Sequence, residues 1–454
     1  MPASPAQEGV WLAHELEQAL AEELVDGASA HSMVAAQAYA LKGELDHKAL
    51  CDALDAISLR HESLRTTFLL DEGGLRQVVR EPGPCGIRPP VVIARGELHA
   101  TLEAFFEEPF DLGEGPVWRS RLLRLAEEEH VLMVLFHHIA NDGWSVDVFH
   151  RELADLYETA AETGFEGELL LEAAGLPALG FQYPDYAVWQ REQDQSERYS
   201  ASIDYWRRYL DGAPPLLELL KEGARPAVRS NAGGHIVHVM SEEVFTGVER
   251  LARELGVTPF AVQLAAFQAL LADRSGQDDF VVGVAAANRS TPEAELLIGF
   301  FLNVLPLRAR RAKDQTFRQY LTQTHRDLVQ ANKHGEVPLV RLLKELRIPR
   351  SAAYNPLFQV SVASHQAFGE PFALPGLDVT LLTLEDHFSV EDLTLYLTRQ
   401  ADGLKAHFVY RTDLFDGSAI ESLARSYTDV LTRVARDPDL LVTGVDARIR
   451  GAQA

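Results

Sequence analysis

An apolar strand pattern, a short polar loop and an amphipathic helix pattern follow one another between residues 131 and 157. The strand pattern ends at two adjacent histidines, and the loop from His137 to Gly143 leads into the helix. The helix pattern is carried by apolar side chains at helical spacing, namely Val146, Phe149, Leu153, Leu156 and Tyr157. A loop between a strand end and a helix start is held on a rigid scaffold, which is a common location for chemistry. The sequence therefore predicts an α/β fold that positions this loop.

Other segments repeat the alternation of helix and strand patterns. Residues 46–60 have the apolar spacing of a helix, and Asp46 can serve as its N-cap. The sequence around residues 71–74 has the composition of a hairpin turn. A second hairpin is predicted from residue 117 to residue 137, directly before the histidine loop.

The chain is long enough for more than one hydrophobic core. Its 454 residues imply two or three domains at about 150 residues each. Glycine- and proline-containing breaks precede a new helix pattern near Ser241. We therefore expect two α/β lobes, comprising residues 1–179 and 180–454, and we see no short sequence repeat between them.

The charge balance and the two cysteines argue against several classes of protein. Aspartate and glutamate number 67 against 42 lysines and arginines, and the resulting negative field disfavours nucleic acid and anionic membranes as partners. No apolar run approaches the roughly 18 residues of a membrane span, and the first residues lack a signal peptide. Cys51 and Cys85 form no CxxC pair, so structural zinc and a disulfide framework are poorly supported. We expect a soluble, cytoplasmic protein.

The paired histidines are the strongest candidates for chemistry. A neutral histidine has an unperturbed pKa of about 6.5, which suits it to accept and return a proton. Neighbouring residues near a strand end point in different directions, so one of His137 and His138 should face a cavity. The alternative is structural, a polar turn with Asp142 as the helix N-cap, and the loop taken alone favours it. A metal at His138 and Asp142 would lack a third ligand nearby.

The loop resembles the HHxxxDG active-site motif of nonribosomal peptide synthetase condensation domains. The shorter pattern HxxxDG also occurs in other acyltransferases, so further motifs are needed to distinguish condensation domains from them. Six more segments are similar to the family's motifs in their family order: Ser4 to Gln7 with Trp11, residues 60–68, residues 183–191, residues 298–308, His334 with Val337 and Pro338, and residues 355–359. On these seven motifs the chain is identified as a member of that family, and we expect a free-standing enzyme.

The resemblance implies two chloramphenicol acetyltransferase-like lobes in a V-shaped pseudo-dimer, with the active site between them. It implies that His138 is catalytic, either removing the proton of the nucleophile or hydrogen-bonding the tetrahedral intermediate. Asp142 should brace the loop by bonding an arginine, and Arg60 and Arg65 are equal candidates. The supporting residues are therefore His137, Asp142, Gly143, Arg60, Arg65 and Asn303.

The resemblance also implies the reaction and its partners. A peptidyl carrier protein would supply an (amino)acyl thioester on its phosphopantetheine arm, and an amine, free or carrier-bound, would attack it to form an amide. The chain itself should bind no cofactor. Ile236 follows Gly233-Gly234-His235 where a carrier attachment serine would stand, so the carriers are other proteins or modules. Because the net charge would not attract an acidic carrier, docking must use a basic or apolar patch that the sequence does not locate.

Three alternatives stay open. The same acyl group could pass to an alcohol and form an ester, as in antibiotic tailoring. An epimerization domain shares the fold and the histidine loop, although residues 142–145 look like a condensation domain. A catalytically silent domain that docks a partner is the third alternative, and the intact His138 and Asp142 argue against it.

Overall fold

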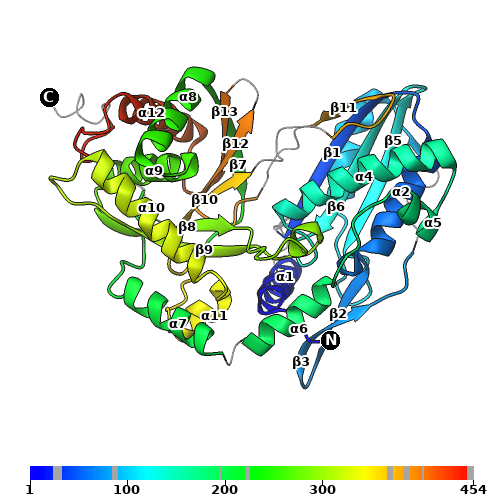
Figure 1. Cartoon of the computed structure of the whole chain (residues 1–454), viewed down its shortest axis with the longest axis horizontal. Coiled ribbons are helices and arrows are strands. Elements are labelled where there is room, and N and C mark those ends of the chain that lie inside the picture. The colour runs from blue at the N-terminus through cyan, green and yellow to red at the C-terminus, as the bar shows by residue number, and fades with distance from the viewer. Residues whose placement is uncertain are drawn as a thin grey trace. The chain divides into compact units, whose positions relative to one another are not determined.

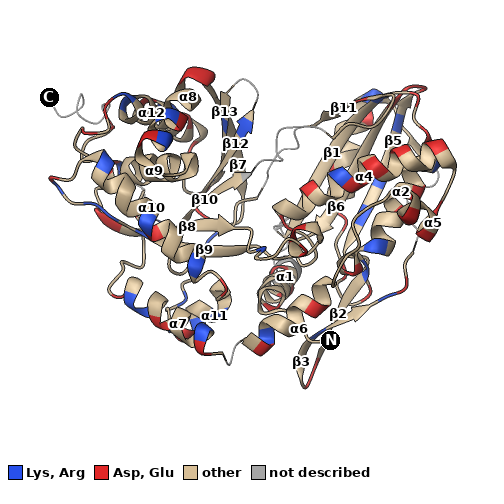
Figure 2. Ribbon diagram, in the orientation of Figure 1, with Lys and Arg blue, Asp and Glu red and all other residues tan. Residues whose placement is uncertain are grey.

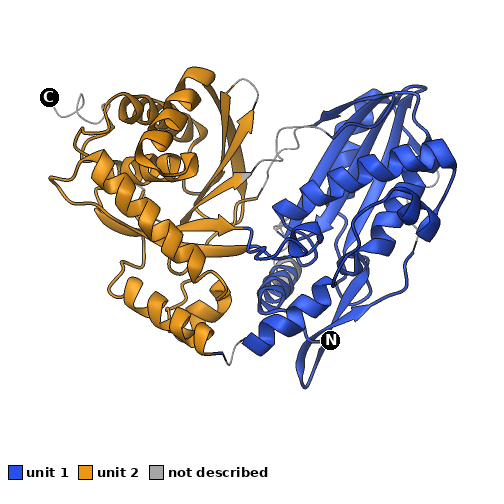
Figure 3. Ribbon diagram, viewed as in Figure 1, with its two compact units in different colours: residues 1–196, 287–302, 370–384 blue, residues 197–286, 303–369, 385–454 orange. Residues whose placement is uncertain are grey.

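The computed structural model describes residues 1–23, 33–83, 90–193, 196–219, 225–365, 372–382, 388–400 and 403–446. The chain divides into two compact units, each with its own sheet (Figures 1 and 3). Unit 1 comprises residues 1–196, 287–302 and 370–384, and unit 2 comprises residues 197–286, 303–369 and 385–454. The predicted mixed α/β fold is confirmed, while the V-shaped arrangement stays a prediction.

Unit 1 is built on a five-stranded sheet with the strand order β11-β1-β6-β5-β4, beside the two-stranded sheet β2-β3. Its strands are β1 (Val34–Gly43), β2 (Thr66–Asp71), β3 (Gly74–Val79), β4 (Val91–Val92), β5 (Trp118–Ala126), β6 (Glu129–His137) and β11 (Leu377–Leu381). Its α-helices are α1 (Pro5–Glu23), α2 (His47–Arg60), α3 (Leu98–Phe106), α4 (Gly143–Thr163), α5 (Gly167–Ala173) and α6 (Tyr183–Gln193).

The local predictions for unit 1 hold. Asp46 caps α2 by accepting a hydrogen bond from the Ala49 N–H at 2.9 Å. Strands β2 and β3 pair across the predicted turn, with Asp71 opposite Gly74. Strands β5 and β6 form the second predicted hairpin, and nearly every residue of β6 is buried. A central strand covered on both faces reads as a continuous apolar run, which is the pattern seen in the sequence.

Unit 2 is built on a six-stranded sheet with the order β7-β13-β12-β10-β8-β9. Its strands are β7 (Gly233–Ser241), β8 (Asp279–Ala286), β9 (Asn303–Arg310), β10 (Val360–His365), β12 (Leu393–Gln400) and β13 (Gly403–Arg411). Its α-helices are α7 (Glu197–Tyr209), α8 (Glu242–Leu255), α9 (Pro259–Ser275), α10 (Phe317–Lys333), α11 (Leu339–Glu345) and α12 (Gly417–Arg436). Helix α9 is apolar and buried along most of its length, so it forms the centre of this core.

The lobe boundary predicted between residues 179 and 180 differs from the division in the structure. Helix α6 belongs to unit 1, where Arg191 donates hydrogen bonds to the Ala3 carbonyl and to Glu8. Strand β11 returns to unit 1 late in the chain and pairs with β1, with Tyr39 opposite Leu381. A single boundary in the sequence cannot describe segments that return to unit 1. The local composition of those segments does not differ from that of their neighbours in the chain.

The two units share a hairpin, loop and helix in the same order. In unit 1 these are β5, β6 and α4, and in unit 2 they are β12, β13 and α12. Each helix begins at an Asp-Gly pair, Asp142-Gly143 or Asp416-Gly417. Counted from these pairs, the buried apolar positions coincide: Val146 with Ile420, Phe149 with Leu423, Leu153 with Tyr427, and Leu156 with Val430. This repeat is not apparent in the sequence, because the two segments share the spacing of their apolar residues and few identical residues.

The net charge is divided unequally between the units (Figure 2). Unit 1 contains 39 Asp and Glu against 14 Lys and Arg, whereas unit 2 contains 28 of each kind. The excess of 25 negative charges therefore belongs to unit 1 alone.

Among the described helices, none is long and apolar enough by itself to cross a membrane. Helices α8 and α9 pass such a test only as a pair, by length and composition, and they are bent by 106° at their junction.

Candidate functional site

The histidine loop connects β6 to α4 and is fixed at both ends by hydrogen bonds. At its start, the His138 N–H donates to the Met33 carbonyl at 2.8 Å. At its end, Asp142 is the N-cap of α4 and accepts from the Ser145 N–H at 2.9 Å and the Ser145 hydroxyl at 2.7 Å. Gly143 is the first residue of α4 and lacks a positive φ, so this turn does not need a left-handed glycine.

His138 is the partly exposed histidine of the pair. Its Nδ1 lies 3.2 Å from the carbonyl oxygen of Asn141. A carbonyl oxygen can only accept, so Nδ1 carries the proton and Nε2 keeps its lone pair. Burial lowers the pKa of His138 below its ordinary value, although the Asn141 carbonyl and the Asp142 charge act in the opposite direction. The imidazole is therefore neutral near neutral pH, and Nε2 can accept a proton.

His137 faces the interior of unit 1 and is 1% exposed. Its Nδ1 accepts a hydrogen bond from the Ile139 N–H at 3.1 Å, and its Nε2 lies 3.2 Å from Nδ1 of His14. Burial lowers the pKa of His137 well below its ordinary value, as do the nearby His14 and His138. Both ring nitrogens are used inside the protein, so the structure places His137 where it supports the loop.

The arginine that pairs with Asp142 is Arg289. Its Nη2 donates to Oδ1 of Asp142 at 2.9 Å, and the two side chains are 1% and 2% exposed. The second carboxylate oxygen accepts from the backbone N–H groups of Phe301 and Leu302 at 2.9 and 3.1 Å. The carboxylate thus joins the loop to the segment of residues 287–302 that returns to unit 1.

The prediction that Arg60 or Arg65 pairs with Asp142 is wrong. Arg60 donates to Glu152 of α4 at 2.9 Å, and Arg65 donates to the Arg80 carbonyl at 2.7 Å. Arg289 lies 147 residues beyond its partner and outside the motifs used for the resemblance. The available signal in the sequence was that Arg289 is the one basic residue between residues 275 and 307, which does not identify its partner.

Residues of the second motif, residues 60–68, also bind the segment of residues 287–302 that returns to unit 1. His61 donates from Nε2 to Glu152 at 2.7 Å and accepts on Nδ1 from the Ile298 N–H at 3.3 Å. The hydroxyl of Ser63 donates to the Ile298 carbonyl at 2.6 Å. Burial by itself would raise the pKa of Glu152, but His61 and Arg60 lower it overall. Arg60 therefore supports the loop indirectly, through a carboxylate in α4.

Asn303 has a structural task inside unit 2. Its side-chain amide donates to the carbonyls of Gly335 and Val337 at 2.9 and 2.8 Å, and its oxygen accepts from the Leu339 N–H at 3.0 Å. The amide is thereby occupied by the turn that precedes α11. This places Asn303 with the sixth motif and makes it an organiser of that turn.

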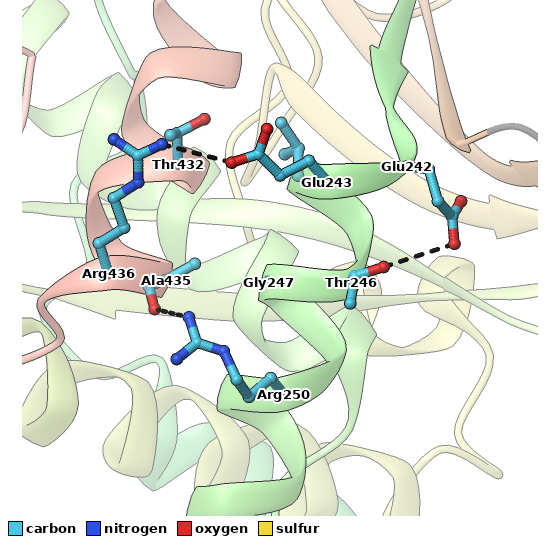
Figure 4. A pocket seen from close by; sticks show the side chains of 9 residues that line it. Glu242, Glu243, Thr246, Gly247, Arg250, Thr432, Ala435 and Arg436 are labelled. Atoms are coloured by element: carbon cyan, nitrogen blue, oxygen red, sulfur yellow. Dashed lines mark hydrogen bonds and ion pairs between the residues drawn. The ribbon is translucent and has the colours of Figure 1, made fainter.

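A pocket of about 450 Å³ lies in unit 2 between α8 and α12 (Figure 4). Its charged side chains all have partners. Arg436 donates to Glu243 at 3.4 Å, Arg250 donates to the Ala435 carbonyl at 2.8 Å, and Glu242 accepts from Thr246 and Arg399. It is lined by no histidine. Within the described ranges, no three His, Cys, Asp or Glu side chains are grouped as metal ligands, and Cys85 lies outside those ranges.

The loop can therefore perform proton transfer on a braced support. It offers one partly exposed neutral imidazole whose Nε2 has no hydrogen-bond partner among the described residues. A buried ion pair and a capped helix fix the backbone of the loop. Such a group can take a proton from an attacking amine or alcohol.

Comparison with known sequences identifies relatives over the whole chain. The family model described as Condensation domain matches residues 1–447. One of the linear gramicidin synthase proteins of Brevibacillus parabrevis is 36% identical over 96% of this chain, and one of the plipastatin synthase proteins of Bacillus subtilis (strain 168) is 33% identical over 98%. The chain spans only 8% and 12% of the length of these two relatives.

Comparison with solved structures gives the same fold. The X-domain from teicoplanin biosynthesis is 29% identical, with a TM-score of 0.84 over 97% of this chain and 96% of that one. The first condensation domain of the calcium-dependent antibiotic synthetase, solved with a substrate analogue, has a TM-score of 0.78 over 97% of each chain. At 22% identity, the second comparison shows the fold alone. Together they confirm the predicted two-lobe α/β architecture of the acyltransferase type.

Proposed function

Because this chain belongs to the condensation-domain family, we propose that it couples a carrier-bound (amino)acyl thioester to an amine and forms an amide. Its relatives include proteins of linear gramicidin synthase and plipastatin synthase. The residue proposed to carry the chemistry is His138. The proposed product is a peptide or a related amide of a natural-product pathway.

In the proposed reaction, the amine nitrogen attacks the thioester carbonyl while Nε2 of His138 accepts its proton. The C–N bond forms, the C–S bond breaks, and the proton passes to the departing thiolate. General-base assistance of this kind typically contributes about 10² to 10⁴ in rate. Asp142 and Arg289 take no part in proton transfer and hold the loop backbone in place.

The observation that carries the proposal is the hydrogen bond from Nδ1 of His138 to the Asn141 carbonyl. It selects the neutral tautomer in which Nε2 has a lone pair. A histidine that stabilises the tetrahedral intermediate by donation would need a proton on Nε2 instead. The tautomer therefore supports the role of proton acceptor over the role of donor.

No metal or nucleotide is part of the proposal, because a thioester is already activated. The phosphopantetheine arm would arrive with the partner carrier protein. The alcohol acceptor remains an alternative for the nucleophile, since the same Nε2 can deprotonate a hydroxyl group.

A second candidate function is the docking of a partner protein. The structure of a complex between the X-domain and OxyB from teicoplanin biosynthesis shows such a role for a protein that is 29% identical to this chain. The braced and partly exposed His138 favours catalysis over docking. The same fold also serves epimerization, which would leave the acyl group uncoupled.

One experiment separates these functions. The protein is incubated with a carrier-loaded aminoacyl thioester and a panel of amines and alcohols, and the products are followed by mass spectrometry. An amide that is absent with the His138→Ala variant supports the proposal, and an ester would assign the alcohol. An inverted but uncoupled acyl group would indicate epimerization, and tight binding without turnover would indicate docking.

A further inference from the structure

Helix α1 directs a row of polar side chains toward the histidine loop within unit 1. Gln7, His14 and Gln18 stand at positions i, i+7 and i+11, which places them on one face of the helix. Gln7 and His14 are 1% and 4% exposed, so this face is buried. Buried polar groups need partners to offset the cost of burial, and the proposed reaction uses none of the three.

Two of these side chains hold the backbone of Ile139, the residue that follows His138. The Gln7 amide donates to the Ile139 carbonyl at 3.2 Å. The Ile139 N–H donates to Nδ1 of His137 at 3.1 Å, and Nε2 of His137 lies 3.2 Å from Nδ1 of His14. Helix α1 therefore binds both polar groups of one backbone residue, one directly and one through His137.

The count of donors and acceptors fixes the proton positions on both histidines. Burial lowers the pKa of His137 well below its ordinary value, so its ring is neutral near neutral pH and carries one proton. Because Nδ1 of His137 accepts from Ile139, that proton is on Nε2 and points to His14. Nδ1 of His14 is therefore an acceptor, and the single proton of the His14 ring is on Nε2.

Gln18 completes this hydrogen-bond chain one helical turn beyond His14. The nitrogen of its side-chain amide lies 2.9 Å from Nε2 of His14 and 3.3 Å from the Phe110 carbonyl. A half-turn of the amide exchanges its nitrogen and oxygen at nearly the same positions, and only the oxygen can accept the His14 proton. The oxygen is the atom on the His14 side, because the Ile139 N–H fixes the other end of the chain.

Aromatic packing holds the two histidine rings in contact. The His14 and His137 rings meet edge to face with centroids 4.9 Å apart, and Phe110 packs on His137 at 5.7 Å. The Arg119 guanidinium covers the Phe110 ring at 4.1 Å. Another ring at position 14 would supply the same packing without the acceptor, so the two contributions of His14 can be separated.

We propose that His14 is a positioning residue for the proton acceptor His138. Its Nδ1 accepts the proton of His137 and keeps that ring in the tautomer that binds the Ile139 N–H. The inference rests on the proposed function, since it adds a residue to the support of the same base. Ile139 lies inside the turn that is closed by the contact between Nδ1 of His138 and the Asn141 carbonyl. Without an acceptor at position 14, a buried N–H of His137 loses its partner, and the ring releases Ile139.

Two substitutions at position 14 separate the hydrogen bond from the packing. His14→Asn keeps an acceptor oxygen near the place of Nδ1 but loses ring volume, whereas His14→Phe keeps a ring without an acceptor. Magnetic resonance of isotope-labelled histidine reports which nitrogen of His137 carries the proton, and hydrogen exchange reports the protection of the Ile139 amide. His14→Asn should leave both as in the unaltered protein. His14→Phe should mix the tautomers, and the Ile139 amide should exchange about 10-fold faster.

The rate of amide formation should follow the same order. With an aminoacyl N-acetylcysteamine thioester and a free amine, we expect kcat to fall about 10-fold in His14→Phe and less than about 3-fold in His14→Asn. Equal behaviour of the two variants would overturn the proposal. So would the reverse order, which a role in packing alone predicts. His14→Leu, which also lacks an acceptor, takes the place of His14→Phe if that variant does not fold.

A matched control removes another buried histidine of unit 1. His150→Ala should keep the His137 tautomer and should leave kcat within about 3-fold, because His150 bonds to Tyr39 and not to the loop. A change in the His137 tautomer in this variant would show that any core defect has the same effect, and would overturn the role of His14. Absence of turnover in the unaltered protein would instead contradict the proposed function. The resonance and exchange measurements then still decide whether His14 sets the His137 tautomer.

Discussion

The two regions built from a hairpin, a loop and a helix, one in each unit, share a backbone arrangement but differ in the side chains of the loop. In unit 1, His137 ends β6 and His138 begins the connection to α4. The matching positions of unit 2 are Arg411, which ends β13, and Thr412. Arg411 is 1% exposed and pairs with Asp392 at 3.2 Å and with Asp413 at 2.6 Å. The same backbone arrangement can therefore hold either a candidate proton-transfer site or a buried ion-pair cluster. The side chains of the loop determine which of the two forms.

The capping aspartates differ in the same way. Asp142 is buried and accepts four hydrogen bonds besides its ion pair with Arg289, whereas Asp416 is exposed and makes no side-chain cap bond. Both begin a long amphipathic helix at an Asp-Gly pair. Asp142 therefore connects the loop to the returning segment, a role beyond helix capping.

A third difference lies inside the helices. At the position where α12 has Ala424, α4 has the buried His150, whose Nε2 lies 2.5 Å from the Tyr39 hydroxyl. Two residues later, Glu152 of α4 binds Arg60, and the matching Ser426 of α12 accepts from Arg274 at 2.7 Å. Unit 1 thus buries titratable groups where unit 2 buries small or neutral ones.

The largest effect is expected from the matched pair His138→Ala and Thr412→Ala. Loss of the proton acceptor should lower kcat by about 10² to 10⁴. Thr412 is exposed and its hydroxyl donates to the Ala232 carbonyl of unit 2, so its variant should keep the rate within about 3-fold. Single-turnover product formation measures both. Equal losses in the two variants would show that the histidine position has no special role.

We expect Asp142 and Asp416 to contribute differently to the free energy of unfolding. Asp142→Asn leaves the buried Arg289 without its charged partner, and breaking such a pair typically costs about 3 to 5 kcal/mol. Asp416→Asn changes an exposed residue and should cost about 0.5 kcal/mol or less. Urea unfolding followed by circular dichroism gives both free energies. Similar values for the two variants would contradict the role of Asp142 as a buried joint.

Acidification should destabilise the protein through His150. Burial lowers its pKa from 6.5 to about 4, so the unfolded state binds the proton more readily. The contribution is complete above pH 6.5 and is lost as pH falls toward 4, with a loss of about 2 kcal/mol at pH 5. His150→Gln should therefore show a flatter fall in unfolding free energy between pH 7.5 and pH 5. An unchanged slope would mean that His150 does not titrate with unfolding.

The smallest effect concerns the pH profile of the reaction. Because burial lowers the pKa of His138, the acid limb of kcat/KM for an aminoacyl N-acetylcysteamine thioester, used as a small donor, should lie below pH 6.5. Replacing the motif histidine of unit 2, His334→Gln, should leave that limb in place. A limb above pH 6.5, or one that moves with His334, would remove His138 as the titrating base.

Much of the local structure could be read from the sequence. The cap of α2 by Asp46, the turn at residues 71–74 and the strand that ends at His137 follow from contacts between near neighbours. The choice of His138 as the chemical candidate rested on a resemblance, and the partial exposure of that ring and its neutral tautomer agree with it. The partner of Asp142 could not be read in this way, because Arg289 arrives on a returning segment.

The sequence by itself determined the family, the mixed α/β fold, the negative charge and the loop with the histidine pair. These depend on local spacing and composition, which act within a few residues along the chain. Only the tertiary structure decided which arginine braces Asp142, which segments return to unit 1, and that the excess charge belongs to that unit. Those features depend on side chains that are far apart in sequence and meet only when both cores bury their apolar surface, so no local pattern can reveal them.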